Sequence, residues 1–285
     1  MTDAPKILKK VLVTAKGGEL LRISHMSSAI GIPMTFALFL PKDYKPKTPL
    51  LFWLSGLTCD DTNFSMKAGP IAFAAAEEKG MAIILPDTSP RGEGVPNVDS
   101  YDLGVGAGFY VNATEEPYSK HYKMYDYVTD ELPSYVFKHW PDLGPSKSIF
   151  GHSMGGHGAL TIALKDPSSW VSVSAFSPIC NPTACPWGEK AFTAYLGSVE
   201  KGKAHDATIL VGEASSNSFD SILIDQGTAD EFLPSQLKPE AFEEAAKKAS
   251  VNVQVNMREG FDHSYYFIAA FVEDHINFHA KRLLA

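Results

Sequence analysis

The segment SIFGHSMGG, residues 148–156, holds the pattern that decides the fold. A short apolar run ends in Gly-x-Ser-x-Gly, and a helix-like segment follows at about 154–165. Between a strand and a helix, this pattern forms a sharp, strained turn that exposes the serine hydroxyl at the end of a sheet. Gly151 and Gly155 leave room for so tight a turn. This context weakens the alternative of a chance match in an ordinary turn, and Ser153 is therefore predicted to be the nucleophile of a serine hydrolase.

Apolar runs and helical periodicity alternate along the chain on both sides of this turn. Continuous apolar runs predict buried strands, and apolar residues at 3.6-residue spacing predict helices. The expected strands lie at 34–40, 50–54, 81–85, 148–150, 171–176, 222–224 and 251–257. The expected helices lie at 70–79, from about 122 to 136, and at 154–165, 239–249 and 265–284. The alternation predicts an α/β-hydrolase fold, in which a mostly parallel central sheet has helices on both faces.

The remaining segments fit one compact unit. Residues 8–14 and 19–25 alternate weakly, which predicts a hairpin with Gly17-Gly18 at its turn. Residues 178–205 look like an inserted loop with a short helix. Because no internal repeat, low-complexity tract or linker interrupts the chain, residues 1–285 are expected to form a single domain.

Composition and charge exclude several classes of protein. The net charge of −8 argues against nucleic acid or an anionic membrane as the main partner. No apolar run approaches the ~18 residues that a membrane span requires. The polar first ten residues do not resemble a secretory signal. The cysteines, Cys59, Cys180 and Cys185, are too few and odd in number for a disulfide framework. We therefore expect a soluble cytoplasmic protein.

The general base is sought among the histidines that follow the acid, because the triad of this fold runs Ser, then Asp or Glu, then His. His263 lies in a loop after a strand and before the last helix, which is the usual place for this base. His275 and His279 lie within that helix, and the glutamate of a zinc-binding H-E-x-x-H motif is absent there. We expect both to be solvated or at the edge of the core, and we predict that His263 is the base.

The acid of the triad should follow a late strand. Asp225 falls at the end of the strand, Asp230 lies in the turn beyond it, and Glu231 is expected at the surface. The turn position is the usual one, so Asp230 is the predicted acid and Asp225 is expected to be structural. Such an acid orients the histidine and stabilises its charged form.

An oxyanion hole in this fold needs two backbone N–H groups. One belongs to the residue after the nucleophile, Met154, at the start of a helix. The loop at 55–58 supplies the other, and Leu57 is the predicted donor. Cys59 lies beside this loop, either as a small packed side chain or as a thiol whose modification blocks the site. Trp187 is expected in the core, with the wall of an acyl pocket as the alternative.

Several longer segments resemble the S-formylglutathione hydrolases, also called the esterase D family. The segments that carry the resemblance are WLSGLTC (53–59), PDTSPRG (86–92), GVGAGFYVNAT (104–114), GHSMGGHGAL (151–160), SVSAFSPICNP (172–182), CPWGEKAF (185–192), ILIDQG (222–227) and FDHSYYFI (261–268). The family's triad maps onto Ser153, Asp230 and His263. Its oxyanion donors map onto Leu57 and Met154, and its cysteine beside the active site maps onto Cys59.

The resemblance implies hydrolysis of S-formylglutathione to formate and glutathione in formaldehyde detoxification, without a metal or cofactor. It also implies a homodimer. A broad carboxylesterase or an acyltransferase is the alternative, and a non-catalytic binding protein of the same fold is a more distant one. The sequence does not indicate how glutathione is held. Its two carboxylates suggest a basic cleft, for which Lys67 and Arg91 are the candidates.

Overall fold

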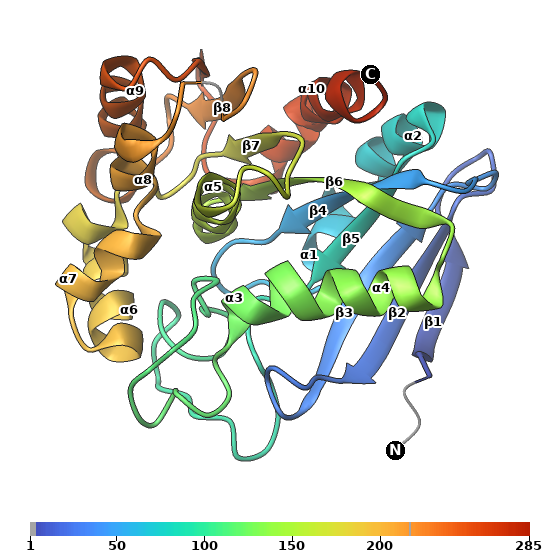
Figure 1. Ribbon diagram of the computed structural model, residues 1–285, viewed down its shortest axis with the longest axis horizontal. Coiled ribbons are helices and arrows are strands. Elements are labelled where there is room, and N and C mark those ends of the chain that lie inside the picture. The colour runs from blue at the N-terminus through green and yellow to red at the C-terminus, as the bar shows by residue number, and fades with distance from the viewer. Residues whose placement is uncertain (1–3, 217) are drawn as a thin grey trace.

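The computed structural model describes residues 4–216 and 218–285, which build one nine-stranded sheet (Figure 1). The order across the sheet is β1-β2-β3-β5-β4-β6-β7-β8-β9. The strands are β1 (Lys6–Leu12), β2 (Glu19–Met26), β3 (Pro33–Leu40), β4 (Thr48–Leu54), β5 (Ala82–Pro86), β6 (Leu143–His152), β7 (Val173–Phe176), β8 (Ile222–Gly227) and β9 (Val253–Arg258). All the predicted strands are therefore present, and the predicted hairpin is β1 and β2.

The sheet has an antiparallel edge and a parallel body. β1, β2, β3 and β5 pair with one another antiparallel in that order. From β5 through β4 to β9 every neighbouring pair is parallel. Parallel strands need covered crossovers, so helices must lie on both faces of this part of the sheet. The carboxyl ends of these strands meet at one edge, where loops can carry a site.

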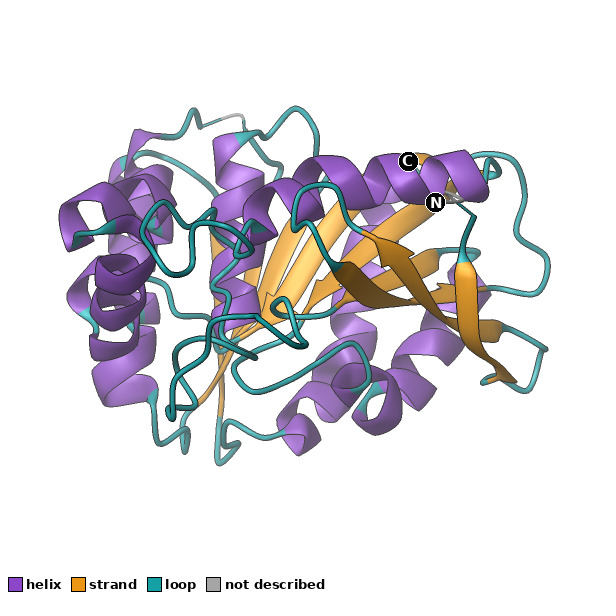
Figure 2. Cartoon of the chain, turned by 90° about the horizontal axis from the view of Figure 1, so that it is seen from below, coloured by secondary structure: helices purple, strands orange, loops and turns teal. Residues whose placement is uncertain are grey.

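Two layers of helices enclose the sheet (Figure 2). The helices are α1 (Asn63–Lys67), α2 (Gly69–Lys79), α3 (Met124–Asp126), α4 (Leu132–His139), α5 (Met154–Lys165), α6 (Pro186–Leu196), α7 (Val199–Gly202), α8 (Ala207–Glu213), α9 (Pro239–Lys248) and α10 (Tyr265–Leu283). Helices α1, α2 and α10 pack on one face, whereas α4, α5, α8 and α9 pack on the other. The predicted α/β-hydrolase architecture is confirmed.

Strand β4 shows why a central strand carries a continuous apolar run. Leu50, Phe52 and Leu54 point into one core, while Leu51 and Trp53 point into the other. Successive side chains of a strand face opposite sides, so a strand between two helical layers must be apolar at every position. All seven residues of β4 are buried.

The sequence did not predict α1 or α8, and it predicted only one short helix within 178–205. That segment holds α6 and α7 together with two 3₁₀ turns. α1 has five residues and buries only Phe64, which is too short a pattern for a helical period to be visible. α8 is capped by Asp206, whose carboxylate accepts hydrogen bonds from the amides of Thr208 and Ile209.

Candidate active site

Ser153 occupies the turn between β6 and α5 in a conformation that serine rarely adopts. Its φ is 58° and its ψ is −118°, and the residue is buried, with 3% of its surface exposed. A Cβ atom at Gly151 would lie 2.3 Å from the carbonyl oxygen of Gly155, and one at Gly155 would lie 2.0 Å from that of Leu54. The two glycines are therefore required by close backbone contact. The strain at Ser153 persists because the surrounding backbone fixes it, including the bond from its N–H to Phe176 O at 3.0 Å.

Two elements bring backbone close to Ser153: the start of α5, and the loop after β4, where a Cβ atom at Gly56 would lie 3.1 Å from Ser153 Cβ. Met154 is the first residue of α5, so its N–H has no acceptor within the helix and lies at the positive end of the helix dipole. Leu57 follows β4 in a loop whose next residue, Thr58, has a φ of 68°. Thr58 donates its N–H to Gly106 O at 2.9 Å, which holds this loop against the segment around Gly106.

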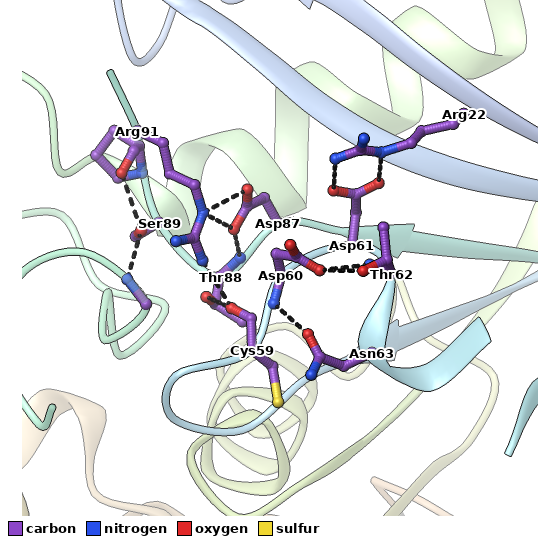
Figure 3. Close-up of polar contacts among 12 residues, drawn as sticks. Arg22, Cys59, Asp60, Asp61, Thr62, Asn63, Asp87, Thr88, Ser89 and Arg91 are labelled. Atoms are coloured by element: carbon purple, nitrogen blue, oxygen red, sulfur yellow. Dashed lines mark hydrogen bonds and ion pairs between the residues drawn. The ribbon is translucent and has the colours of Figure 1, made fainter. Parts of the chain in front are cut away.

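A polar network anchors the stretch of chain that follows Leu57 (Figure 3). Arg91 donates from Nε to both oxygens of Asp87, at 3.0 and 2.9 Å, and from Nη2 to Cys59 O at 2.8 Å. Arg22 makes a two-pronged bond to Asp61, at 2.6 and 2.9 Å, from the neighbouring strand β2. Burial raises the pKa of Asp87 to about 6, even beside the Arg91 guanidinium.

His263 and Asp230 form a close pair at the carboxyl edge of the sheet. His263 Nδ1 lies 2.6 Å from Asp230 Oδ2. The other oxygen, Asp230 Oδ1, accepts the N–H of Phe232 at 2.9 Å, and Gln226 Nε2 donates to Oδ2 at 3.3 Å. Burial disfavours the charged carboxylate, but the hydrogen bond and charge of His263 outweigh it and lower the pKa of Asp230. Asp230 therefore faces the His263 ring as a carboxylate.

The ring of His263 is held between two others. His152, next to the nucleophile, lies with its ring centroid 4.4 Å from that of His263, and Phe232 meets His263 edge-on at 5.0 Å. Burial, and then the charge of His263, hold the pKa of His152 well below its usual range. A neutral His152 can therefore pack against His263 without adding a charge. The sequence did not predict this contact, although His152 directly precedes Ser153 in the chain.

One pocket of about 650 Å³ brings these groups together. Ser153, His263, Leu57 and His152 all line it. Trp187 lines it as well and is buried in the core, and its role as a wall for the acyl group stays a prediction. A pocket of this volume is within the range of small-molecule sites.

Comparison with known proteins places this geometry in a family. The family model described as "Putative esterase" matches residues 27–278. An S-formylglutathione hydrolase from Rattus norvegicus is 52% identical over 273 residues, which are 94% of this chain and 96% of that protein. The chain belongs to this esterase family.

Solved structures agree with the assignment. An S-formylglutathione hydrolase from Agrobacterium tumefaciens superposes with a TM-score of 0.92 at 44% identity, covering 98% of this chain and 99% of that one. A ferulic acid esterase from Anaeromyces mucronatus, at 21% identity, has a TM-score of 0.63 over 98% of this chain and 91% of that one. The second likeness shows the fold alone. The predicted resemblance and the class of serine hydrolases are confirmed for this esterase.

Cys59 of the esterase lies at the pocket wall with its side chain mostly buried. Its sulfur is 3.8 Å from the hydroxyl of Tyr265. Burial raises the pKa of the thiol, which keeps it protonated. Cys59 is therefore a packed side chain at the pocket wall, and the blocking of the site by its modification stays a prediction.

Lys67 and Arg91, the two candidates for a basic cleft, differ in their position relative to the pocket. Lys67 lines the pocket. Arg91 does not, because its guanidinium is engaged by Asp87 and by the carbonyl of Cys59 (Figure 3). The pocket therefore does not support Arg91 as a ligand for glutathione. Arg91 instead bonds to Cys59 O in the segment that follows Leu57.

The prediction that His275 and His279 are solvated or at the edge of the core is wrong, because both are fully buried between α10 and the sheet. His279 contacts Ser172 and Ser174, each at 2.8 Å, and His275 contacts Ser174 at 2.8 Å. Serines on β7 and just before it provide buried hydrogen-bond partners for both histidines, and the sequence of the helix alone does not show these partners. Within residues 4–216 and 218–285, no cluster of three or more His, Cys, Asp or Glu side chains could hold a metal ion.

Asp225 belongs to a separate network below the site. Its carboxylate is buried and bonded to Arg258 at 2.8 Å and to Asn256 at 2.7 Å. Burial disfavours its charged form, but the bonds from His275, Asn256 and Arg258 outweigh it and lower the pKa of Asp225. These partners agree with the structural role expected of it.

No helix among the described residues is long and apolar enough to cross a membrane.

Proposed function

We propose that this esterase hydrolyses S-formylglutathione to formate and glutathione, with Ser153 as nucleophile, His263 as general base and Asp230 as the acid that orients it. The observation that carries the proposal is the 2.6 Å contact between His263 and Asp230 beside the strained Ser153. The names of the relatives from Rattus norvegicus and Agrobacterium tumefaciens support the substrate.

The reaction then proceeds in two halves. Ser153 Oγ attacks the formyl carbon while His263 takes its proton, and the carbonyl oxygen becomes an oxyanion held by the N–H groups of Leu57 and Met154. The C–S bond breaks, the glutathione thiolate leaves, and His263 can return the proton to it. A water molecule gives its proton to His263 and attacks the formyl-enzyme carbon. Formate leaves as the C–O bond to Ser153 breaks and the proton returns to Ser153. No step uses a cofactor.

Three wider expectations belong to this proposal. We propose that residues 1–285 form one domain, because strands from both ends of the described chain share one sheet. We propose that the enzyme works in the cytoplasm, where the free thiols of its three buried cysteines remain reduced. The homodimer implied by the resemblance stays a prediction, and light scattering on the purified protein tests it.

A series of glutathione thioesters tests the substrate. One methylene in a fitted pocket is worth about 1–3 kcal/mol of discrimination, so kcat/KM should fall by about tenfold or more from formyl to acetyl and again to butyryl. A preference for the butyryl thioester would favour a broad carboxylesterase instead. In parallel, Ser153→Ala should abolish turnover while retaining the melting temperature of the parent enzyme. Unchanged turnover in this variant would refute Ser153 as the nucleophile.

A further inference from the structure

The pocket is electrostatically unlike the molecule that contains it. The protein carries a net charge of −8, yet no Asp or Glu lines the pocket among the described residues. Lys67 brings the one permanent charge to that lining. A cationic group in the pocket therefore favours an anionic ligand, although the protein as a whole is acidic.

The ammonium of Lys67 is placed by an aromatic ring rather than by a carboxylate. It lies 4.8 Å from the centroid of the Tyr265 ring, which also lines the pocket. No ion pair of Lys67 occurs within the described parts of the chain. A cation over an aromatic face is attracted to it without being neutralised. The positive charge of Lys67 thus remains available to a ligand.

Asn63 presents a second donor from the same helix. Its Oδ1 accepts the N–H of Asp60 at 2.9 Å, so its NH₂ group is directed away from that contact (Figure 3). In the same view the NH₂ group lies on the side of the Cys59 sulfur, and both residues line the pocket. Asn63 and Lys67 are four residues apart, a spacing that puts two side chains on one face of a helix.

We propose that the ammonium of Lys67 and the amide NH₂ of Asn63 bind one carboxylate of the glutathione moiety, which makes this corner of the pocket the subsite for the leaving group. The inference rests on the proposed function and names how the same site selects its thiol. The glycine carboxylate of glutathione can lie about 7 Å from its cysteine, taking about 3.5 Å for each extended residue. Ser153 and Lys67 line the same pocket of about 650 Å³, so a thiol of this length can extend from the acyl group at Ser153 toward Lys67.

The decisive measurement compares two formyl thioesters on each variant: S-formylglutathione and the uncharged S-formyl-N-acetylcysteamine. Lys67→Met keeps a linear stem over Tyr265 but removes the charge. We expect the ratio of kcat/KM values, glutathione to cysteamine thioester, to fall about fivefold, as for an exposed charge pair worth about 1 kcal/mol. The loss should lie in KM, because the contact is the same in the ground and transition states. Lys67→Arg should restore the ratio, and Lys67→Glu should lower it further.

Lys79→Met is the matched control, because Lys79 ends α2 outside the pocket. It should leave the ratio unchanged. A ratio that Lys67→Met does not alter, or that Lys79→Met alters equally, overturns the proposal.

A binding measurement separates this inference from the proposed function. S-methylglutathione is titrated into Ser153→Ala, with and without Lys67→Met, by calorimetry. Weaker binding in the double variant supports the subsite even if the parent enzyme prefers another acyl group. Equal binding, or no binding to Ser153→Ala, overturns it. Failure of the proposed function shows itself elsewhere, as poor turnover of S-formylglutathione by the parent enzyme.

Discussion

Replacing Asp230 by asparagine is the sharpest test of the proposed chemistry. Asp230 is fully buried at its side chain and contacts His263 Nδ1 at 2.6 Å. Asparagine keeps the size and one oxygen acceptor but removes the negative charge that would face the imidazolium formed during the reaction. The cost should therefore lie in the transition state and not in the fold.

The magnitude follows from the distance and the burial. Two unit charges about 4 Å apart interact by about 4 kcal/mol at an effective dielectric constant of about 20. Since each 1.36 kcal/mol is a factor of ten in rate, losing about 3–4 kcal/mol should lower kcat/KM by roughly 10²–10³. Steady-state hydrolysis of S-formylglutathione measures this loss, and thermal denaturation verifies that the variant remains folded.

Asp225→Asn is the matched control, because Asp225 is also a buried carboxylate and lies within β8, the strand that Asp230 follows. Its partners are Arg258 and Asn256 rather than His263. Removing its charge leaves the Arg258 guanidinium without its buried partner, which should cost about 3 kcal/mol of unfolding free energy. Turnover should stay within about threefold of the parent enzyme at 25 °C. If Asp225→Asn destroys activity while Asp230→Asn retains it, the acid has been assigned to the wrong carboxylate.

Three further substitutions test the scaffold of the site. Gly155→Ala should cost at least about 3 kcal/mol in urea denaturation, because its Cβ would lie 2.0 Å from Leu54 O; a cost below 1 kcal/mol would contradict the close contact. Asp87→Asn should lower stability by about 1–3 kcal/mol and reduce kcat, since Arg91 then holds Cys59 O less firmly; unchanged kinetics and melting would refute the anchoring role. His157 is buried with a pKa lowered to about 3 by burial, so the unfolded chain binds more protons below pH ~6.5 and stability must fall on acidification. From pH 7 to pH 5 this group alone should cost about 2 kcal/mol, and His157→Gln should flatten the decline; a parallel decline would show that other groups dominate.

The sequence by itself determined the features that depend on neighbours in the chain. The bend at Ser153 follows from Gly151 and Gly155, where no side chain has room, and α5 follows from the periodicity after it. The apolar run of β4 predicts a strand that is buried on both faces. Such restraints act through the local backbone, so a single stretch of residues is enough to reveal them.

The tertiary structure decided everything that depends on which segments meet. It buried His275 and His279 against serines of another element, and it engaged Arg91 with Asp87 instead of leaving it at the pocket. It also packed His152 against His263 across more than a hundred residues of chain, and it left Lys67 as the permanent charge in the described pocket lining. The fate of a polar side chain depends on the partner that packing brings to it, and the spacing of residues along one chain does not contain that information.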